Sequence, residues 1–300
     1  MNSAIVIFSY NRPKHLSKLI DTIIKNNINK SYKIYLFCDG PKNKLDQFKI
    51  NNIKEIIKEK KISFTHKKYR KKNIGLSKNI IDGISFVLRR HKSCIVLEDD
   101  LIINKNCITF MNTMLHKLKK DHSLGSVSAH SYLDDFKSKS KFDFYISKRH
   151  SSWCWGTWSR VWNDINWNET YYKNHFSKKK EINKFSEGGK DLNLLLWGNY
   201  KKFIDSWAIR FNFSCAKKEL KSFQPRFSMI RNDGRDASGT HEKFSFKFKK
   251  KYNFNPKIGE IKNILDRTIK NEEIDCYIKN SHRRSVKLSI RYFLEEGKIL

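Results

Sequence analysis

The most constraining feature of this sequence is a regular alternation, over residues 1–130, of short apolar runs with longer amphipathic stretches. Such alternation is typical of βα units that build a parallel sheet. The apolar runs are Ala4–Phe8, Ile34–Cys38, Ser63–His66, Cys94–Leu97 and Gly125–Ala129. We therefore predict an α/β fold with a Rossmann-like, mostly parallel sheet.

The stretches between these runs predict helices on both faces of the sheet. In one of them, Ile80, Ile84 and Val87 recur at helical spacing, which gives an apolar stripe. Pro13 suits the first turn of another, where its missing N–H has no helical partner to lose. The predicted helices are Pro13–Lys25, Asp46–Lys60, Leu76–Arg90 and Asn106–Lys119.

Beyond residue 130 the sequence becomes irregular and rich in aromatic residues, and from Glu242 it is rich in Lys and Phe. The chain then turns helical in pattern and ends in Ser285–Leu300, a basic amphipathic segment. We predict one large domain over residues 1–241, divided into halves at residue 130, and a basic helical C-terminal appendage over residues 242–300.

The charge of the chain is strongly positive, with 62 Lys and Arg against 30 Asp and Glu and a formal net charge of +32. This excess would attract nucleic acid, anionic lipid or phosphorylated substrates. Because the lysines are spread along nearly the whole chain, a generally solvated surface explains them as well. With 39% hydrophobic residues, the chain has enough apolar surface to fold, which excludes an intrinsically disordered protein.

Six scattered cysteines form no C-x-x-C pair and no zinc-like group with histidine, which favours a reducing compartment. The N-terminus has neither a basic leader nor a cleavage site, and no stretch approaches the ~20 apolar residues of a spanning helix. The sequence therefore predicts a cytoplasmic protein.

Polar segments follow the predicted strands at the points where they end. In open parallel sheets, ligands bind beyond the carboxyl ends of the strands, so we expect these segments to converge on a ligand site. They are Ser9–Pro13, Asp39–Lys42, Asn73–Ser77 and Glu98–Asp100.

The last of these segments places three carboxylates directly after a buried strand. Adjacent carboxylates repel one another unless a cation lies among them. In extended geometry Glu98 and Asp100 point to one side and Asp99 to the other. This arrangement suits a divalent ion held by Asp100, with Glu98 or Asp99 reaching a bound ligand. The alternative is a solvated acidic turn with no ligand.

Two further positions permit a nucleotide pocket. Asp39 would accept hydrogen bonds from a base or a ribose, although Asp39–Lys42 also reads as an ordinary turn. Gly75 would let the backbone approach a ligand closely, although the segment around it also reads as the start of a helix.

Taken together, these motifs resemble family 2-like GT-A glycosyltransferases, in order and spacing as well as in residues. The segments that carry the resemblance are Phe8–Pro13, Cys38–Lys42, Asn73–Leu76 and Val96–Asp100. Four later segments resemble bacterial surface-polysaccharide transferases and, more distantly, the N-acetylglucosaminyltransferase I family. These are Ser151–Trp158, Ile204–Arg210, Arg231–Gly234 and Ser238–His241. The resemblance covers residues 3–241.

The resemblance implies the GT-A fold, a nucleotide-sugar donor, a divalent metal (Mn²⁺ or Mg²⁺) and inversion at the anomeric carbon. It makes residues 1–130 the donor half and residues 131–241 the acceptor half. Donor contacts are expected from Ser9, Asn11, Arg12, Asp39, Asn73, Gly75, Glu98 and Asp99. Metal contacts are expected from Asp100 and His241. The acidic motif reads Glu-Asp-Asp where the family has a spaced Asp-x-Asp, so the donor contact falls to either Glu98 or Asp99.

For the catalytic base, the sequence offers Asp205 and, as its rival, Asp191. Asp205 lies between Ile204 and Trp207, so we expect a partly desolvated carboxylate, which accepts a proton more readily. If the chain is helical from Asp191 through to Asp205, the two acids lie about four helical turns apart. Each would also serve as a helix cap or as the buried partner of Arg210.

The tryptophans of residues 153–158 suit stacking on an acceptor sugar, although large aromatic residues are often core. The candidates for the acceptor wall are Trp153, Trp155 and Trp158, whereas we expect Trp162 and Trp167 in the core.

The sequence therefore predicts transfer of a sugar from a nucleotide diphosphate to an acceptor hydroxyl. We expect a saccharide or lipid-linked saccharide acceptor, a role in bacterial surface polysaccharide or lipooligosaccharide synthesis, and no nucleic-acid partner. The basic tail would rest on the anionic inner face of a membrane, or pack on the catalytic domain. Two alternatives stay open: a non-catalytic basic module that binds nucleic acid or membrane, and a nucleotidyltransferase.

Overall fold

The computed structural model of the chain describes residues 2–137, 141–234, 265–270, 272–282 and 284–297. Its strands are β1 (Ala4–Ser9), β2 (Ile34–Cys38), β3 (His66–Tyr69), β4 (Ser93–Glu98), β5 (Leu101–Ile103), β6 (Leu124–Ser128), β7 (Phe144–Ser147), β8 (Trp155–Trp158), β9 (Lys221–Pro225), β10 (Ile230–Asn232) and β11 (Thr268–Ile269). The predicted α/β fold with a mostly parallel sheet is confirmed.

In the described part of the chain, one sheet has the strand order β11-β7-β9-β6-β8-β4-β1-β2-β3. Strands β3, β2, β1 and β4 are parallel neighbours. β8 runs antiparallel to both β4 and β6 and joins the two halves of the sheet. A separate pair, β5 with β10, is antiparallel. The carboxyl ends of β1, β2 and β4 therefore meet at one edge.

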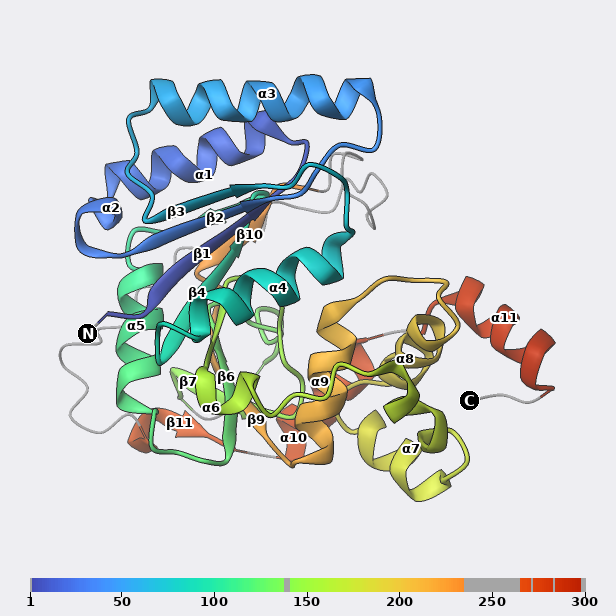
Figure 1. Cartoon of the computed structure of the whole chain (residues 1–300). Helices are drawn as coiled ribbons and strands as arrows, with labels where there is room; N and C mark the ends of the chain where they lie inside the picture. Colours follow the sequence, from blue (N-terminus) through green and yellow to red (C-terminus); the bar gives the residue numbers. More distant parts are fainter. Residues whose placement is uncertain (1, 138–140, 235–264, 271, 283, 298–300) are drawn as a thin grey trace.

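Helices flank the sheet (Figure 1). They are α1 (Pro13–Lys25), α2 (Ile28–Ser31), α3 (Lys44–Glu59), α4 (Leu76–Leu88), α5 (Cys107–Lys117), α6 (Ser159–Trp162), α7 (Lys179–Ser186), α8 (Leu192–Tyr200), α9 (Trp207–Lys217), α10 (Glu272–Ser281) and α11 (Val286–Glu296), with short 3₁₀ helices at Glu169–His175 and Leu265–Arg267. In Figure 1, α1 and α3 lie on one side of β1–β3, and α4 lies on the other. The expected covering of both faces is thus present.

Local sequence explains where several of these helices begin and end. Pro13 opens α1, as predicted, with its ring in the first turn. Asn43 caps α3 by accepting a hydrogen bond from the Asp46 amide, and Ser206 caps α9 in the same way through Ile209. Gly297 closes α11 with a positive φ of 66°, a conformation that glycine adopts without strain.

Two predicted elements differ from the structure. The strand expected at Ser63–His66 is β3, which begins only at His66. Its ladder with β2 starts there, opposite Tyr35, so residues 63–65 precede the strand. β3 is an edge strand whose Lys67 and Lys68 are exposed, so no apolar run marks it. The helix after Asp191 ends at Tyr200, and the amides of Phe203 and Ile204 turn back onto the Gly198 carbonyl.

The core continues beyond the first half of the chain. Leu133, Phe136 and Tyr145 pack with Ile274 and Ile278 of α10. β11 pairs in parallel with β7 and extends the sheet by one short strand. The predicted boundary between domain and tail at residue 241 lies outside the described residues. Parts of the segment after it nevertheless belong to the main fold.

Candidate active site

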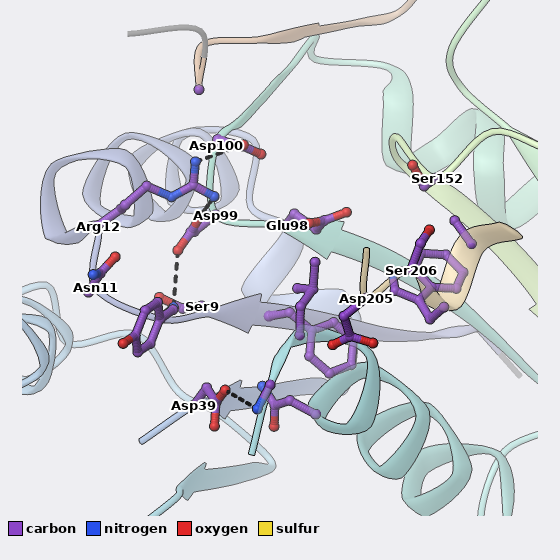
Figure 2. Close-up of a pocket in the computed structure, with 18 of the residues that line it drawn as sticks. Ser9, Asn11, Arg12, Asp39, Glu98, Asp99, Asp100, Ser152, Asp205 and Ser206 are labelled. Carbon is purple, nitrogen blue, oxygen red and sulfur yellow. Dashed lines mark hydrogen bonds and ion pairs between the residues drawn. The ribbon is translucent and has the colours of Figure 1, made fainter. Parts of the chain in front are cut away.

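A cavity of about 310 Å³ lies beyond the carboxyl ends of β1, β2 and β4 and is closed on the far side by the start of α9 (Figure 2). Most of the predicted site residues line it. These are Ser9, Asn11, Arg12, Asp39, Asn73, Gly75, Glu98, Asp99, Asp100, Trp153 and Asp205. The structure therefore gathers residues separated by almost 200 positions in the sequence into one pocket.

Arg12 links two of the three carboxylates at the end of β4. Its guanidinium lies 2.7 Å from Asp99 and donates to Asp100 across 2.9 Å. The predicted alternation of sides ends at Glu98, because Asp99 and Asp100 form a turn and both face the same guanidinium. Figure 2 shows Glu98 between this cluster and the Asp205–Ser206 segment.

The acidic cluster carries more negative charge than Arg12 neutralises. Burial, together with the neighbouring Asp100 and Asp99, raises the pKa of Glu98 to about 8, and Arg12 opposes this shift only in part. Burial would lower the pKa of Arg12, but Asp99 and Asp100 outweigh it and the pKa rises. Among the described residues, only Arg12 forms ion pairs with Asp99 and Asp100.

The segment after β10 lies directly against the acidic turn. The Asp233 amide donates to the Asp100 carbonyl across 2.9 Å, and a Cβ on Gly234 would collide with the Asp100 carboxylate. Only glycine fits there without moving the acid. The predicted second metal ligand, His241, lies outside the described residues. Within the described ranges, no three His, Cys, Asp or Glu side chains form a group that could hold a metal ion.

Asp39 is occupied by the protein itself, which differs from the expectation that it receives a base or ribose. One carboxylate oxygen accepts hydrogen bonds from the amides of Gly40 and Ile74, and the other from the Gly75 amide and the Asn73 side chain, at 2.8–3.1 Å. Asp39 is also buried. Its main effect is to clamp the 73–75 loop against the end of β2 (Figure 2).

Asp46 is a buried residue of the site region that the sequence did not single out. Its carboxylate accepts hydrogen bonds from the Tyr10 hydroxyl at 2.6 Å, the Asn11 amide group at 2.7 Å and the Lys42 backbone amide at 3.1 Å. Burial acts to raise the pKa of Asp46, but the bonds from Tyr10 and Asn11 bring it below its usual range. The sequence feature that could have identified Asp46 is its place in the first turn of a helix that directly follows the polar segment Asp39–Lys42.

Asp205 lines the cavity from the loop between α8 and α9. Its carboxylate accepts a hydrogen bond from the Ser77 amide at 3.3 Å, at the start of α4, and lies 3.5 Å from the Arg210 guanidinium. The side chain is 57% exposed, so the expected desolvation is wrong. Gly75 faces it with a φ of 86°, and a Cβ there would stand 3.3 Å from the carboxylate.

Asp191, the rival base, lies outside the cavity lining. Its two carboxylate oxygens accept hydrogen bonds from Arg149 at 2.8 and 2.9 Å, and both side chains are largely buried. The bidentate pair gives Asp191 a structural role, but its arginine is Arg149 rather than the Arg210 that the sequence suggested. Arg210 lies beside Asp205 instead.

Of the three candidate acceptor tryptophans, only Trp153 lines the cavity. Trp155 is fully buried and stacks on Trp207 with ring centroids 4.9 Å apart. Trp158 is buried as well and donates its indole N–H to the Leu115 carbonyl. Trp155 and Trp158 are therefore core residues, because both lie on β8 in the middle of the sheet. Trp162 is in the core, as expected, whereas Trp167 packs against it and is only partly buried.

Residues 4–180 match the family model described as glycosyl transferase family 2. The chain belongs to glycosyl transferase family 2. It is therefore a glycosyltransferase. The match decides against the non-catalytic basic module and the nucleotidyltransferase.

Several solved structures are similar to this glycosyltransferase. A mannosyltransferase from Pyrobaculum calidifontis, in complex with GDP-Man and Mn²⁺, has 13% identity and a TM-score of 0.35 over 52% of this chain and 44% of its own. Glucosyl-3-phosphoglycerate synthase from Mycobacterium tuberculosis, with Mn²⁺ and UDP, has 10% identity and a TM-score of 0.31 over 42% and 43%. The galactosyltransferase LgtC, with donor and acceptor sugar analogs, has 7% identity and a TM-score of 0.42 over 73% and 72%.

The glycosyltransferase thus spans less than half of the first two proteins. At these identities and TM-scores the likenesses say nothing about activity. No curated protein matches the sequence. None of the described helices has the length and apolar composition needed to cross a bilayer.

Proposed function

We propose that this glycosyltransferase uses a divalent metal, Mn²⁺ or Mg²⁺, and transfers its sugar with inversion to an acceptor hydroxyl. The observation that carries the proposal is the pairing of two features across one cavity. The acidic turn after β4 forms one wall, and Asp205 stands on the other. A cation site and a proton acceptor on opposite walls suit direct displacement at a carbon between them.

The acidic turn offers oxygen ligands of the kind a divalent metal takes, although its three carboxylates do not form a complete metal-binding group by themselves. Hard cations take oxygen ligands, and here Glu98, Asp99 and Asp100 bring three carboxylates to one wall of the cavity. With Arg12 as their only ion-pair partner among the described residues, the cluster retains negative charge that a cation would offset. Asp100 would hold the metal, with His241 as the expected second protein ligand. When bound, the metal would neutralise charge on the donor diphosphate.

The protein's own groups would perform the remaining steps. Arg12, held by Asp99 and Asp100, would face the donor phosphates. Ser9 and Asn73, which line the same cavity, would border the nucleoside. Glu98, between the acidic turn and Asp205, would contact the donor sugar. Asp205 would take the proton from the acceptor hydroxyl as the new glycosidic bond forms. Since the acceptor attacks from the face opposite the leaving group, the anomeric configuration inverts.

Residues 1–130 would form the donor half and residues 131–241 the acceptor half. Trp153, which borders the cavity from the segment before β8, would support the apolar face of the acceptor sugar. We propose a saccharide or lipid-linked saccharide acceptor of bacterial surface polysaccharide or lipooligosaccharide synthesis. The enzyme would act in the cytoplasm, at the inner face of the membrane.

The test is a panel of nucleotide sugars with simple glycoside acceptors, in Mn²⁺, in Mg²⁺ and in excess chelator. Released nucleoside diphosphate and the mass of the product report transfer, and the anomeric proton coupling of the product reports its configuration. A retained configuration would exclude direct displacement. Undiminished transfer in chelator would exclude the metal.

A further inference from the structure

Helix α11 has two apolar faces on opposite sides. Leu288 and Tyr292 are buried and pack on Leu194 and Trp197 of α8. The opposite face carries Val286, Ile290, Phe293 and Leu294, whose exposed fractions are 73%, 56%, 54% and 75%. These four residues follow the i, i+4, i+7, i+8 spacing of one helical face. A helix packed only on its own domain needs one apolar face.

The outward face is an unusual concentration of exposed apolar surface. Large hydrophobic side chains rarely gather on the surface of a soluble monomer unless they contact a partner or a membrane. The described residues include nine exposed large hydrophobic side chains, and this single helix carries four of them. Figure 1 shows α11 at the rim of the molecule, outside α8 and far from β1–β3, where a flat surface can reach it.

Basic residues border the outward face. Lys287 and Arg291 lie along one side of it, and Arg284 precedes the helix; all three are exposed. The two acids of the helix, Glu295 and Glu296, are both paired with Lys201, at 3.0 and 3.3 Å. With Arg284, Lys287, Arg291 and Lys201, the helix and its border carry four positive charges against these two negative ones, so the charge around the apolar stripe is positive. An apolar face with a basic border is the pattern of helices that lie in the headgroup region of an anionic bilayer.

The same helix braces the loop that carries Asp205. Lys201, at the start of this loop, pairs with Glu295 and Glu296, and the Arg291 guanidinium lies 4.4 Å from the ring centroid of Phe203. Phe203 is itself partly exposed beside α11. A surface that receives α11 would thus lie next to the loop that forms one wall of the cavity.

We propose that α11 docks through Val286, Ile290, Phe293 and Leu294 on an anionic lipid bilayer, and that docking holds the Asp205 loop beside acceptors carried in that bilayer. The second clause rests on the proposed function, whereas the docking itself does not. The helix would lie in the plane of the interface, with its buried face still on α8.

The test uses the full chain and vesicles of phosphatidylcholine, either pure or with equimolar phosphatidylglycerol. We expect co-sedimentation with the anionic vesicles and little with the neutral ones. The double variant Ile290→Ser/Phe293→Ser should bind anionic vesicles about tenfold more weakly or worse, because two buried side chains are lost from the contact. Lys287→Glu should weaken binding several-fold, and more so at low salt.

A matched control is the double variant Leu45→Ser/Phe48→Ser on α3, whose side chains are 61% and 62% exposed. It removes as much exposed apolar surface elsewhere and should leave vesicle binding unchanged. Thermal unfolding of both variants checks the fold. Nucleotide release with a water-soluble acceptor, measured in parallel, separates failure of docking from failure of the proposed transferase.

Three outcomes would overturn the proposal. Parent protein that stays in the supernatant with anionic vesicles excludes docking. Equal losses in the α11 and α3 variants would mean that the α11 face has no special role. A parent that is dimeric by light scattering, with a monomeric Ile290→Ser/Phe293→Ser variant, would make this face a contact between two copies of the chain.

Discussion

Tyr10 donates its hydroxyl hydrogen to Asp46 across 2.6 Å and thereby ties the end of β1 to the first turn of α3. Asn11 and the Lys42 amide reach the same carboxylate, so one buried acid positions both loops that border the cavity after β1 and β2. Asp46 does not itself line the cavity. It is a positioning residue.

We expect Asp46→Asn to weaken binding of a nucleoside diphosphate about tenfold and to lower the free energy of unfolding by about 1–3 kcal/mol, because bonds to a charged group are lost. Calorimetric titration and urea unfolding measure the two effects. Asp21→Asn removes an acid that is exposed and paired with Lys60, and it should change neither. A loss of stability with unchanged nucleotide affinity would reduce Asp46 to a purely structural role.

Asp100→Ala tests the metal site. The fold should persist, because Arg12 keeps its ion pair with Asp99. Metal-dependent turnover should fall at least about a hundredfold, since metal-assisted charge stabilisation is worth several kcal/mol. Nucleotide release across a manganese titration measures this. Asp164→Ala, which removes an exposed acid paired with Lys218, serves as the control. Normal manganese-dependent activity in Asp100→Ala would remove the assignment.

Asp205→Asn should lower the transfer rate, whereas Asp191→Asn should lower the stability of the protein. Loss of a general base should lower the transfer rate by about 10²–10⁴ with donor affinity retained, so Asp205→Asn should be a stable, slow enzyme. Asp191→Asn leaves the buried Arg149 without its anionic partner and should cost about 3–5 kcal/mol of stability. Single-turnover transfer and urea unfolding of both variants give the comparison. A fast Asp205→Asn and a slow, fully stable Asp191→Asn would move the base to Asp191.

Trp153 and Trp155 are two residues apart, but Trp153 lines the cavity whereas Trp155 is fully buried. Trp153→Ala should raise the KM for the acceptor about tenfold and leave the fold intact, because its ring borders the cavity. Trp155→Ala should destabilise the protein by about 3–5 kcal/mol, because it empties a fully buried site. Acceptor kinetics and thermal unfolding distinguish them. An unchanged acceptor KM in Trp153→Ala would argue against the sugar wall.

His150 predicts a loss of stability in acid. Burial lowers its pKa to about 4, and its Nε2–H donates to the Leu220 carbonyl at 3.2 Å. Between about pH 6.5 and 4 the unfolded chain takes up a proton that the folded protein refuses, so stability falls as pH falls. At pH 5 this amounts to about 2 kcal/mol relative to pH 7.5.

Urea unfolding of the parent and of His150→Gln at both pH values measures this contribution. The drop in stability should be smaller by about 2 kcal/mol in the variant. His122→Gln, a change at an exposed histidine, should behave as the parent. Equal drops in the parent and in His150→Gln would contradict the assignment.

The parts of the fold that sequence predicted are those fixed by local pattern. β2 and α1 have the predicted bounds, because an unbroken apolar run and a proline-led amphipathic stretch are legible without their neighbours. β3 was misplaced because an edge strand with two exposed lysines has no such run. Its position depends on pairing with β2, a contact that the local sequence does not encode.

The sequence predicted where the cavity lies, but it did not predict which of the side chains there are free to contact a ligand. The polar strand ends do line one cavity, since parallel strands bring their carboxyl ends together. Whether a side chain there is free for a ligand depends on partners distant in sequence. Asp39 is saturated by the 73–75 loop, Trp155 is covered by Trp207, and Asp205 is more exposed than its apolar neighbours suggested.

The antiparallel strand β8 has an evolutionary consequence. It joins β4, whose end carries the acidic turn, to β6 and the strands beyond it through main-chain hydrogen bonds, which do not depend on side-chain identity. The cavity walls contributed by Ser152, Trp153, Ser206 and Ala208 can therefore change while the strand ends before residue 101 stay constant. Under the proposed function, new acceptor preferences would arise by substitution on one side of β8, while the acidic turn after β4 stays intact.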